Sequence, residues 1–126
     1  MTQKVTVQAC GKPHSYYNII LGTEEDDMIT GTNLPDLIFA LGGDDIVFGE
    51  KGNDCIFGGE GDDIIYGNEG NDNISGGEGT DVIKGLSGND ILNGGLGIDV
   101  IDGGDDTDSC NVNDQSKEDL IVKCES

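Results

Sequence analysis

The sequence predicts an all-β fold, a solenoid built from short strands, and three observations lead to that prediction. A nine-residue unit recurs ten times between residues 22 and 111, without an insertion or a deletion. The sixth place of every copy is aspartate, and the eighth place is aliphatic in nine of the ten copies. A short unit repeated at a fixed period is typical of stacked architectures, in which each unit buries its apolar side against its neighbours.

The composition indicates that a large hydrophobic core cannot be what stabilises this chain. Only 34% of the 126 residues are hydrophobic and none is tryptophan, so one domain with a thin core is expected. A net charge of −20 causes strong self-repulsion in a compact state. Either the chain is disordered or bound cations neutralise the acid, and the strict period with its aliphatic residues favours the cations. Six basic residues are too few for a nucleic-acid surface, and no apolar run is long enough for membrane insertion.

Residues 1–21 precede the repeats and are predicted to form an N-terminal cap. Residues 4–9 alternate polar and apolar side chains, which is typical of a short edge strand. Residues 10–13 have turn chemistry, and residues 19–21 lead apolar side chains into the first repeat. An open solenoid needs such a segment to cover its exposed end.

Each repeat, 22–111 in all, is predicted to consist of a glycine-rich turn and a short strand. Place one is glycine in nine copies and Ala40 in the other, whereas place four departs from glycine at Glu25, Leu34 and Asp106. Glycine permits the positive φ and the close backbone approach that an ion-binding turn requires. The place-four glycines are Gly43, Gly52, Gly61, Gly70, Gly79, Gly88 and Gly97.

Places seven to nine are predicted to form a strand of three residues. The aliphatic place eight points inward, and places seven and nine point outward, because successive strand side chains alternate between faces. The inward side chains then stack in a ladder that is one side chain thick. After the repeats, residues 112–126 are predicted to form a C-terminal cap, with residues 119–123 as its closing strand.

The pattern G-G-x-G-x-D-x-(aliphatic)-x, clearest at residues 58–66, resembles the nonapeptide of the RTX (repeat-in-toxin) calcium-binding family. The resemblance covers residues 22–111. It implies a parallel β-roll, a right-handed β-helix solenoid in which each nonapeptide is half a coil. Ten repeats then make about five coils and two stacked parallel sheets, with odd and even repeats on opposite sheets.

The resemblance also implies where calcium binds, between one turn and the turn two repeats later. One turn supplies carbonyl oxygens from places two and four, the other supplies them from places one and three, and each adds its aspartate. Independently of the family, calcium prefers six or more oxygen ligands, while an array without histidine disfavours zinc and copper. The expected ligands are Asp27, Asp36, Asp45, Asp54, Asp63, Asp72, Asp81, Asp90, Asp99 and Asp108.

The expected number of calcium ions is five to eight, because the turns are not equally regular. Asp27 with Asp45 and Asp36 with Asp54 are expected to be poor sites, since Glu25, the Leu34–Pro35 pair and the Ala40–Leu41 pair break the turn pattern. The alternative is that the aspartates are only solvated turn residues. The expected good pairs are Asp45–Asp63, Asp54–Asp72, Asp63–Asp81, Asp72–Asp90 and Asp81–Asp99, followed by Asp90–Asp108.

Four cysteines in a small acidic chain favour two disulfides and an oxidising, extracellular location. A bond between Cys110 and Cys124 would hold the C-terminal cap over the end of the core. By elimination Cys10 then pairs with Cys55, and the alternative for that pair is two free thiols. The N-terminal segment would lie across Leu37, Phe39, Cys55 and Phe57.

Two surface features have a functional and an ordinary explanation. An outward apolar column beside Phe48 and Tyr66 is either a surface for self-association or a result of the strand preference for β-branched residues. Asn73 begins a glycosylation sequon, although short sequons also arise by chance. The column consists of Met28, Ile46, Ile64, Val82 and Val100.

The sequence contains no catalytic constellation, since its only histidine, His14, has no nucleophile or acid near it in sequence. The first functional hypothesis is therefore a non-enzymatic, extracellular protein that folds on calcium and has a structural, cell-surface, matrix or filament-forming role. The second is a calcium-dependent folding or secretion domain of a larger RTX enzyme or toxin. The two caps and paired cysteines favour the first.

Overall fold

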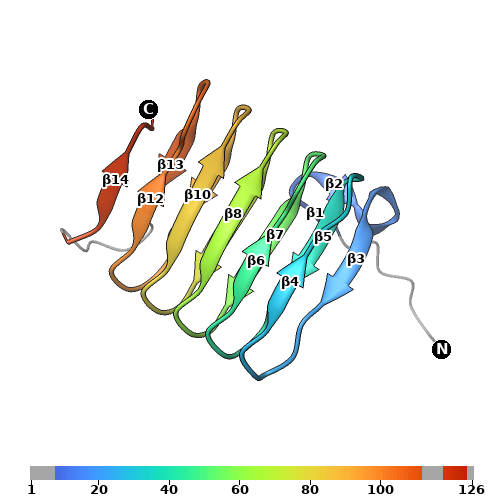
Figure 1. Ribbon diagram of the computed structural model, residues 1–126, viewed down its shortest axis with the longest axis horizontal. Helices are drawn as coiled ribbons and strands as arrows, with labels where there is room; N and C mark the ends of the chain where they lie inside the picture. The colour runs from blue at the N-terminus through green and yellow to red at the C-terminus, as the bar shows by residue number, and fades with distance from the viewer. Residues whose placement is uncertain (1–7, 112–117, 125–126) are drawn as a thin grey trace.

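A computed structural model describes residues 8–111 and 118–124 of the chain. It is an all-β solenoid in which two parallel six-stranded sheets lie face to face (Figure 1). This confirms the fold class that the sequence predicts. We call the two layers the odd sheet and the even sheet, after the numbers of the repeats that supply their central strands. The odd sheet therefore contains the even-numbered strands, and the even sheet contains the odd-numbered ones.

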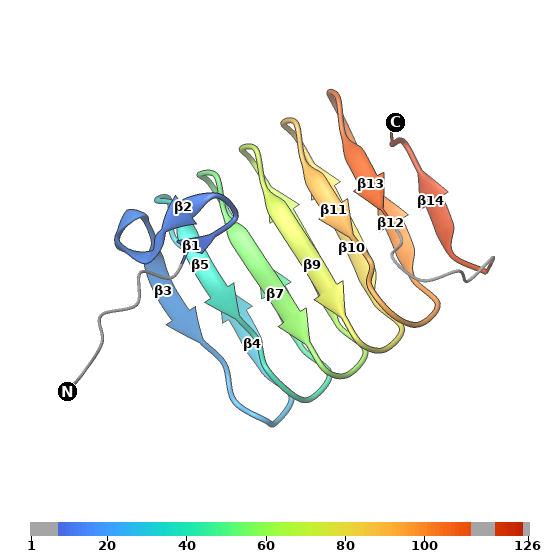
Figure 2. The ribbon, with the colours of Figure 1, turned by 180° about the vertical axis from the view of Figure 1, so that it is seen from behind.

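The odd sheet faces the viewer in Figure 1 and the even sheet in Figure 2. The strands of the odd sheet are β4 (Met28–Thr30), β6 (Ile46–Phe48), β8 (Ile64–Asn68), β10 (Val82–Leu86), β12 (Val100–Asp102) and β14 (Leu120–Val122). Those of the even sheet are β3 (Asn18–Leu21), β5 (Asp36–Phe39), β7 (Cys55–Gly59), β9 (Asn73–Gly77), β11 (Ile91–Asn93) and β13 (Ser109–Asn111).

The repeats stack in register, so that each coil of the solenoid comprises two nonapeptides. Ile46 pairs with Ile64, which pairs with Val82 in the next strand of the same sheet. Equivalent places therefore form columns that run along the whole roll.

Each sheet has six strands, whereas the sequence predicts about five. β3 pairs with β5 so that Asn18 lies opposite Asp36, and β14 pairs with β12 so that Leu120 lies opposite Val100. The reason is that the segments flanking the ten repeats have enough strand character to extend the ladder, even where the turn pattern is lost.

The strand lengths also differ from the prediction in the middle of the roll. β4, β6 and β11 to β13 have the expected three residues, but β7 to β10 have five. The added residues occupy places one and two of the following repeat, where glycine allows the extended backbones to approach closely, as Gly59 and Gly77 do in their paired positions.

The core is the ladder of place-eight side chains between the two sheets. Ile20 packs at one end, and Cys110 and Cys124 pack at the other. The inward direction predicted for place eight is therefore correct. The buried core residues are Ile29, Ile38, Ala40, Val47, Ile56, Ile65, Ile74, Ile83, Leu92 and Ile101.

The N-terminal segment folds onto the outer face of the even sheet (Figure 2). It contains β1 (Gln8–Ala9), β2 (Lys12–Pro13) and the short 3-10 helix η1 (His14–Tyr16). Together with the Cys10–Cys55 disulfide it buries the side chain of Leu37 completely. The predicted strand over residues 4–9 lies mostly outside the described residues.

The C-terminal end is held by a second disulfide, between Cys110 and Cys124, whose Cα atoms are 5.7 Å apart. Both disulfides join the pairs that the sequence predicts. The predicted closing strand is β14, while residues 112–117 and 125–126 of the predicted cap lie outside the described residues.

Candidate metal centres in the turns

The place-six aspartates lie inside the turns, and from Asp45 onward one oxygen of each accepts a backbone N–H from the preceding coil. The backbone N–H of Asp45 donates to Oδ1 of Asp63 at 2.8 Å, and that of Asp63 donates to Oδ1 of Asp81 at 2.8 Å. The pattern continues along both edges of the roll, from Asp27 to Asp108. Of the ten carboxylates, nine are 0 to 2% exposed, Asp27 being the exception.

The other oxygen of these carboxylates has a different environment. In six of the turns Oδ2 is buried and has no hydrogen-bond partner within the described part of the chain. Backbone carbonyl groups lie close to it: a Cβ added at Gly58 would lie 2.7 Å from Oδ2 of Asp63 and 2.6 Å from the carbonyl oxygen of Gly76. A buried charged oxygen that faces other acceptors is costly unless a cation is present. The six residues are Asp45, Asp54, Asp63, Asp72, Asp81 and Asp90.

The pKa values of the buried turn aspartates are raised, which also indicates a shortage of positive charge in their surroundings. Burial raises the pKa of Asp54 to about 8 and that of Asp72 to about 9, although a backbone N–H bond to each carboxylate opposes the rise. Burial also raises the pKa of Asp63, Asp81 and Asp90 to about 7. The pKa of Asp45 is raised for the same first reason. Without a cation, the carboxylates of Asp54 and Asp72 therefore hold protons at neutral pH.

The donor set fits calcium. Calcium takes six to eight oxygen ligands, and each turn offers a carboxylate oxygen together with backbone carbonyl groups. Gly59 and Gly61 adopt φ of 91° and 104°, and these values curve the turn around the carboxylate. Within the described residues, no three His, Cys, Asp or Glu side chains form a group that could hold a metal, so backbone oxygens must complete any site.

The first two turns are closed by threonine. The N–H of Thr23 donates to Oδ2 of Asp27 at 2.7 Å, and its hydroxyl donates to the same oxygen at 2.9 Å. Thr32 makes the equivalent N–H bond to Oδ2 of Asp36 at 2.7 Å. These donors occupy the oxygen that has no hydrogen-bond partner among the described residues in the six turns named above. The turns predicted to be poor metal sites therefore differ physically from the others.

Two departures from the repeat pattern leave the turn geometry intact. Leu41 at place two adopts φ of 75°, and Asp106 at place four adopts φ of 70°. Both resemble the glycines at the same places, Gly59 and Gly61. The prediction that Ala40–Leu41 breaks the turn is therefore wrong at the level of the backbone.

Place five forms a second ladder that the sequence analysis does not predict. On the edge of the roll formed by the turns of the odd repeats, which we call the odd edge, Asp44 donates its N–H to Oδ1 of Asp26. Asp62 donates its N–H to Oδ1 of Asp44, and both distances are 2.8 Å. On the even edge Asn71 donates to Oδ1 of Asn53 at 2.8 Å. The signal is present in the sequence, because place five alternates between Asp and Asn over repeats three to six.

The C-terminal segment contains another carboxylate that the period of nine does not find. Asp119 precedes β14 and follows Asp99 by 20 residues, whereas the repeats are 18 apart. Its Oδ1 accepts the N–H of Asp99 at 2.7 Å. The signal is the Asp-Leu-Ile-Val order of residues 119–122, which parallels Asp-Val-Ile-Asp at residues 99–102.

The family comparison agrees with this geometry. The model of the RTX calcium-binding nonapeptide repeat (4 copies) matches residues 21–54, 54–83 and 84–115. The chain belongs to the RTX calcium-binding repeat family. It is thus a calcium-binding β-roll, and no match is found among curated proteins. None of the described residues belongs to a helix that is long and apolar enough to cross a bilayer.

The predicted glycosylation residue of this RTX chain, Asn73, is half-buried beside the N-terminal segment. It lines a cavity of about 210 Å³ together with Tyr16 and Tyr17. Glycosylation at Asn73 stays a prediction.

Proposed function

We propose that this protein is a non-enzymatic, extracellular β-roll that folds when calcium binds and then has a structural role. The observation that carries the proposal is the row of buried Oδ2 atoms beside backbone carbonyl groups. A metal ion that binds only the folded turns contributes its binding free energy to folding.

The geometry supports six calcium ions within the repeats. A site needs two turns in which the carboxylate is not already closed by threonine, and this condition excludes the pairs that contain Asp27 or Asp36. Six divalent ions would offset much of the net charge of −20. The six pairs are Asp45–Asp63, Asp54–Asp72, Asp63–Asp81, Asp72–Asp90, Asp81–Asp99 and Asp90–Asp108.

Circular dichroism and calorimetric titration test the proposal. The chelated chain should have little β content at neutral pH, and calcium should restore it with a stoichiometry near six, whereas magnesium should not because it demands a smaller octahedral site. Asp63→Asn should remove two ions, since Asp63 belongs to two pairs. Asp62→Asn is the matched control, because Asn53 and Asn71 make the same ladder bond at place five. Unchanged β content after chelation would refute metal-coupled folding.

The extracellular location is supported by two features. Both described disulfides would be stable in an oxidising compartment. Millimolar extracellular calcium also suits repeated sites of modest affinity.

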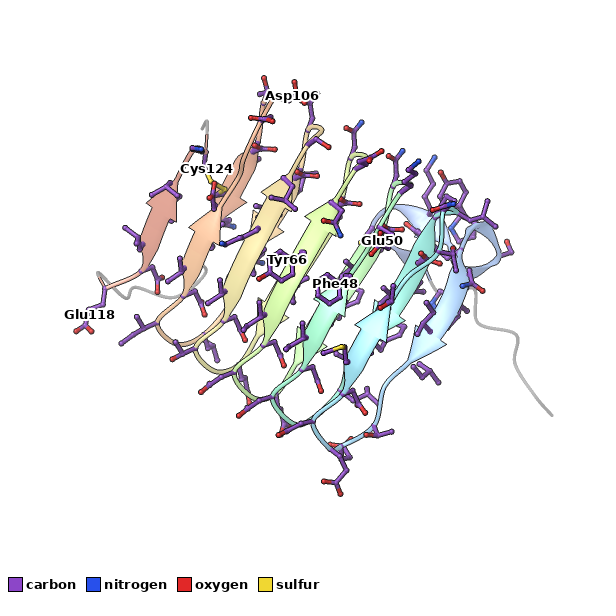
Figure 3. All side chains as sticks on the ribbon, in the orientation of Figure 1. Phe48, Glu50, Tyr66, Asp106, Glu118 and Cys124 are labelled. Atoms are coloured by element: carbon purple, nitrogen blue, oxygen red, sulfur yellow. A yellow bond between two sulfur atoms is a disulfide. The ribbon has the colours of Figure 1, made fainter. Side chains whose placement is uncertain are left out.

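Self-association through the odd sheet is the form of structural role that we favour. Its outer face has no covering segment among the described residues, and Met28 is 73% exposed at its end. Phe48 and Tyr66 stack at 5.2 Å between ring centroids, beside the outward apolar column that begins at Met28 (Figure 3). The even sheet, in contrast, buries Leu37 under the N-terminal segment.

Sedimentation of the calcium-bound chain over a range of concentrations tests this role. We expect reversible oligomers, and Ile64→Lys in the centre of the odd sheet should dissociate them by placing charge in an apolar contact. Ile91→Lys, at a 54% exposed position of the even sheet, is the control. A monomer at all concentrations, or equal effects of the two variants, would contradict the proposal.

A further inference from the structure

The last strand of the odd sheet reproduces a repeat, although it lies beyond the family match, which ends at residue 115. β14 pairs with β12 in parallel, with Ile101 opposite Ile121 and Asp102 opposite Val122. Asp119 therefore holds the position that place six has in the repeats.

The contacts of Asp119 are those of a repeat aspartate. Its Oδ1 accepts the N–H of Asp99 at 2.7 Å, and the N–H of Leu120 donates to the carbonyl oxygen of Asp99 at 2.8 Å. In the preceding coil the N–H of Asp81 donates to Oδ1 of Asp99 at 2.9 Å, and Val100 donates to the carbonyl oxygen of Asp81 at 2.9 Å. The hydrogen-bond ladder thus continues past the last repeat.

The remaining oxygen of Asp119 is in the same position as its counterparts. Its Oδ2 is buried and has no hydrogen-bond partner among the described residues. Such an oxygen needs a cation, for the reason given for the repeats. Figure 3 shows that the side chain of Glu118, the residue before Asp119, points away from the roll.

The other end of β14 provides an independent sign that this strand substitutes for a repeat. Gly103 donates its N–H to the carbonyl oxygen of Val122 at 3.0 Å. The carbonyl oxygen of Lys123 lies where a Cβ of Gly103 would be, as the oxygen of Gly76 does at Gly58.

We propose that Asp119 and Asp99 hold one further calcium ion at the odd edge, and that this ion fixes β14 on the end of the roll. The inference rests on the proposed function, because it assumes that the repeats bind calcium. The Cys110–Cys124 disulfide ties the end of β14 that follows Val122, whereas the ion ties the end at Asp119. The strand is then held at both ends.

The test compares Asp119→Asn with Asp105→Asn, an exposed acid on the last even turn, in the full chain with both disulfides formed. Calcium stoichiometry is measured by titration, and amide hydrogen exchange is measured at free calcium about ten times the dissociation constant. Asp119→Asn should bind one ion fewer than the wild type. Its amides at Leu120–Val122 should exchange about tenfold faster, because a ligand at about ten times its dissociation constant suppresses opening of its site by about tenfold.

The remaining outcomes decide the inference. Asp105→Asn should match the wild type in both measurements, and β6 and β8 should stay protected in both variants. An unchanged stoichiometry in Asp119→Asn would overturn the proposal, and so would a loss of protection in β6 and β8, because the ion would then not act locally. A wild-type chain that binds no calcium would instead refute the proposed function.

Discussion

At the scale of single residues, place one shows why the repeat needs glycine. A Cβ at this place would lie against both the carboxylate of its own turn and a carbonyl oxygen of the next coil, as the surroundings of Gly58 show. The glycine therefore leaves room for the oxygens that calcium would join. Only Ala40 departs from this rule, in the turn next to the threonine-closed ones.

Replacing Gly58 by alanine should weaken calcium binding and lower the stability of the folded form. The added methyl group would overlap Oδ2 of Asp63 and the carbonyl oxygen of Gly76, and overpacking of this kind costs about 1–3 kcal/mol. Denaturant unfolding in saturating calcium measures the free energy of unfolding. Gly42→Ala is the control, because its methyl group would mainly meet the flexible carboxylate end of Glu24. Equal losses in the two variants would show that the turn oxygens are not the cause.

At the scale of elements, the sequence predicts the central strands, the closing strand and both disulfides. It does not predict that Asn18–Leu21 and Leu120–Val122 each add a sixth strand to a sheet, because neither segment has a glycine-rich turn before it. Asn18 stands at place six counted back from Asp27, and its side-chain amide donates to Oδ1 of Asp36 at 3.0 Å. The period alone misses Asp119, because two additional residues precede it.

The turns show the same limit on sequence prediction. Whether Leu41 or Asp106 can adopt positive φ depends on the coils stacked on either side, and a pattern of glycines does not contain that information. The closure of Asp27 by Thr23 could have been predicted from a hydroxyl at place two, since threonine readily bonds nearby groups.

Removing the Cys10–Cys55 disulfide by a double serine substitution should destabilise the calcium-bound chain more than removing Cys110–Cys124. The first bond spans 45 residues and the second spans 14. Loop-closure entropy then predicts losses of about 4 and about 3 kcal/mol. Denaturant unfolding at fixed calcium gives both values. The first variant should also bind a hydrophobic dye, because Leu37 would lose its cover, and a variant without added dye binding would contradict this account of the N-terminal segment.

At the scale of the whole molecule, the net charge makes folding depend on which cation occupies the turns. Protons and calcium compete for the same carboxylates, so the metal-free and the calcium-bound forms should respond to pH in opposite directions. In the metal-free form the folded-state pKa values of about 7 to 9 exceed the ordinary aspartate value of about 3.9. The folded state then binds more protons than the unfolded chain, so its stability is greatest below about pH 4 and falls as pH rises toward 9.

In chelator, the β content should therefore be higher at pH 5 than at pH 8, and in excess calcium it should be higher at pH 8. Circular dichroism at the two pH values, at constant ionic strength, measures both comparisons. A chelated chain whose β content rises with pH would show that the buried carboxylates are not what opposes folding. Calcium-saturated samples at both pH values control for aggregation near the isoelectric point.

The alternation between the two edges also restricts how a protein of this kind can change in length. In repeats three to six, the odd turns have aspartate at place five and precede strands of the odd sheet, whose outer face has no covering segment among the described residues. The even turns of these repeats have asparagine there and precede strands of the sheet that carries the N-terminal segment. Duplication or loss of one nonapeptide between β3 and Cys55 would exchange the two sides for every residue beyond it, and Cys55 would then lie in the odd sheet, out of reach of Cys10. In this part of the chain, viable descendants should therefore gain or lose eighteen residues at a time, a rule that the lengths of natural homologues can test.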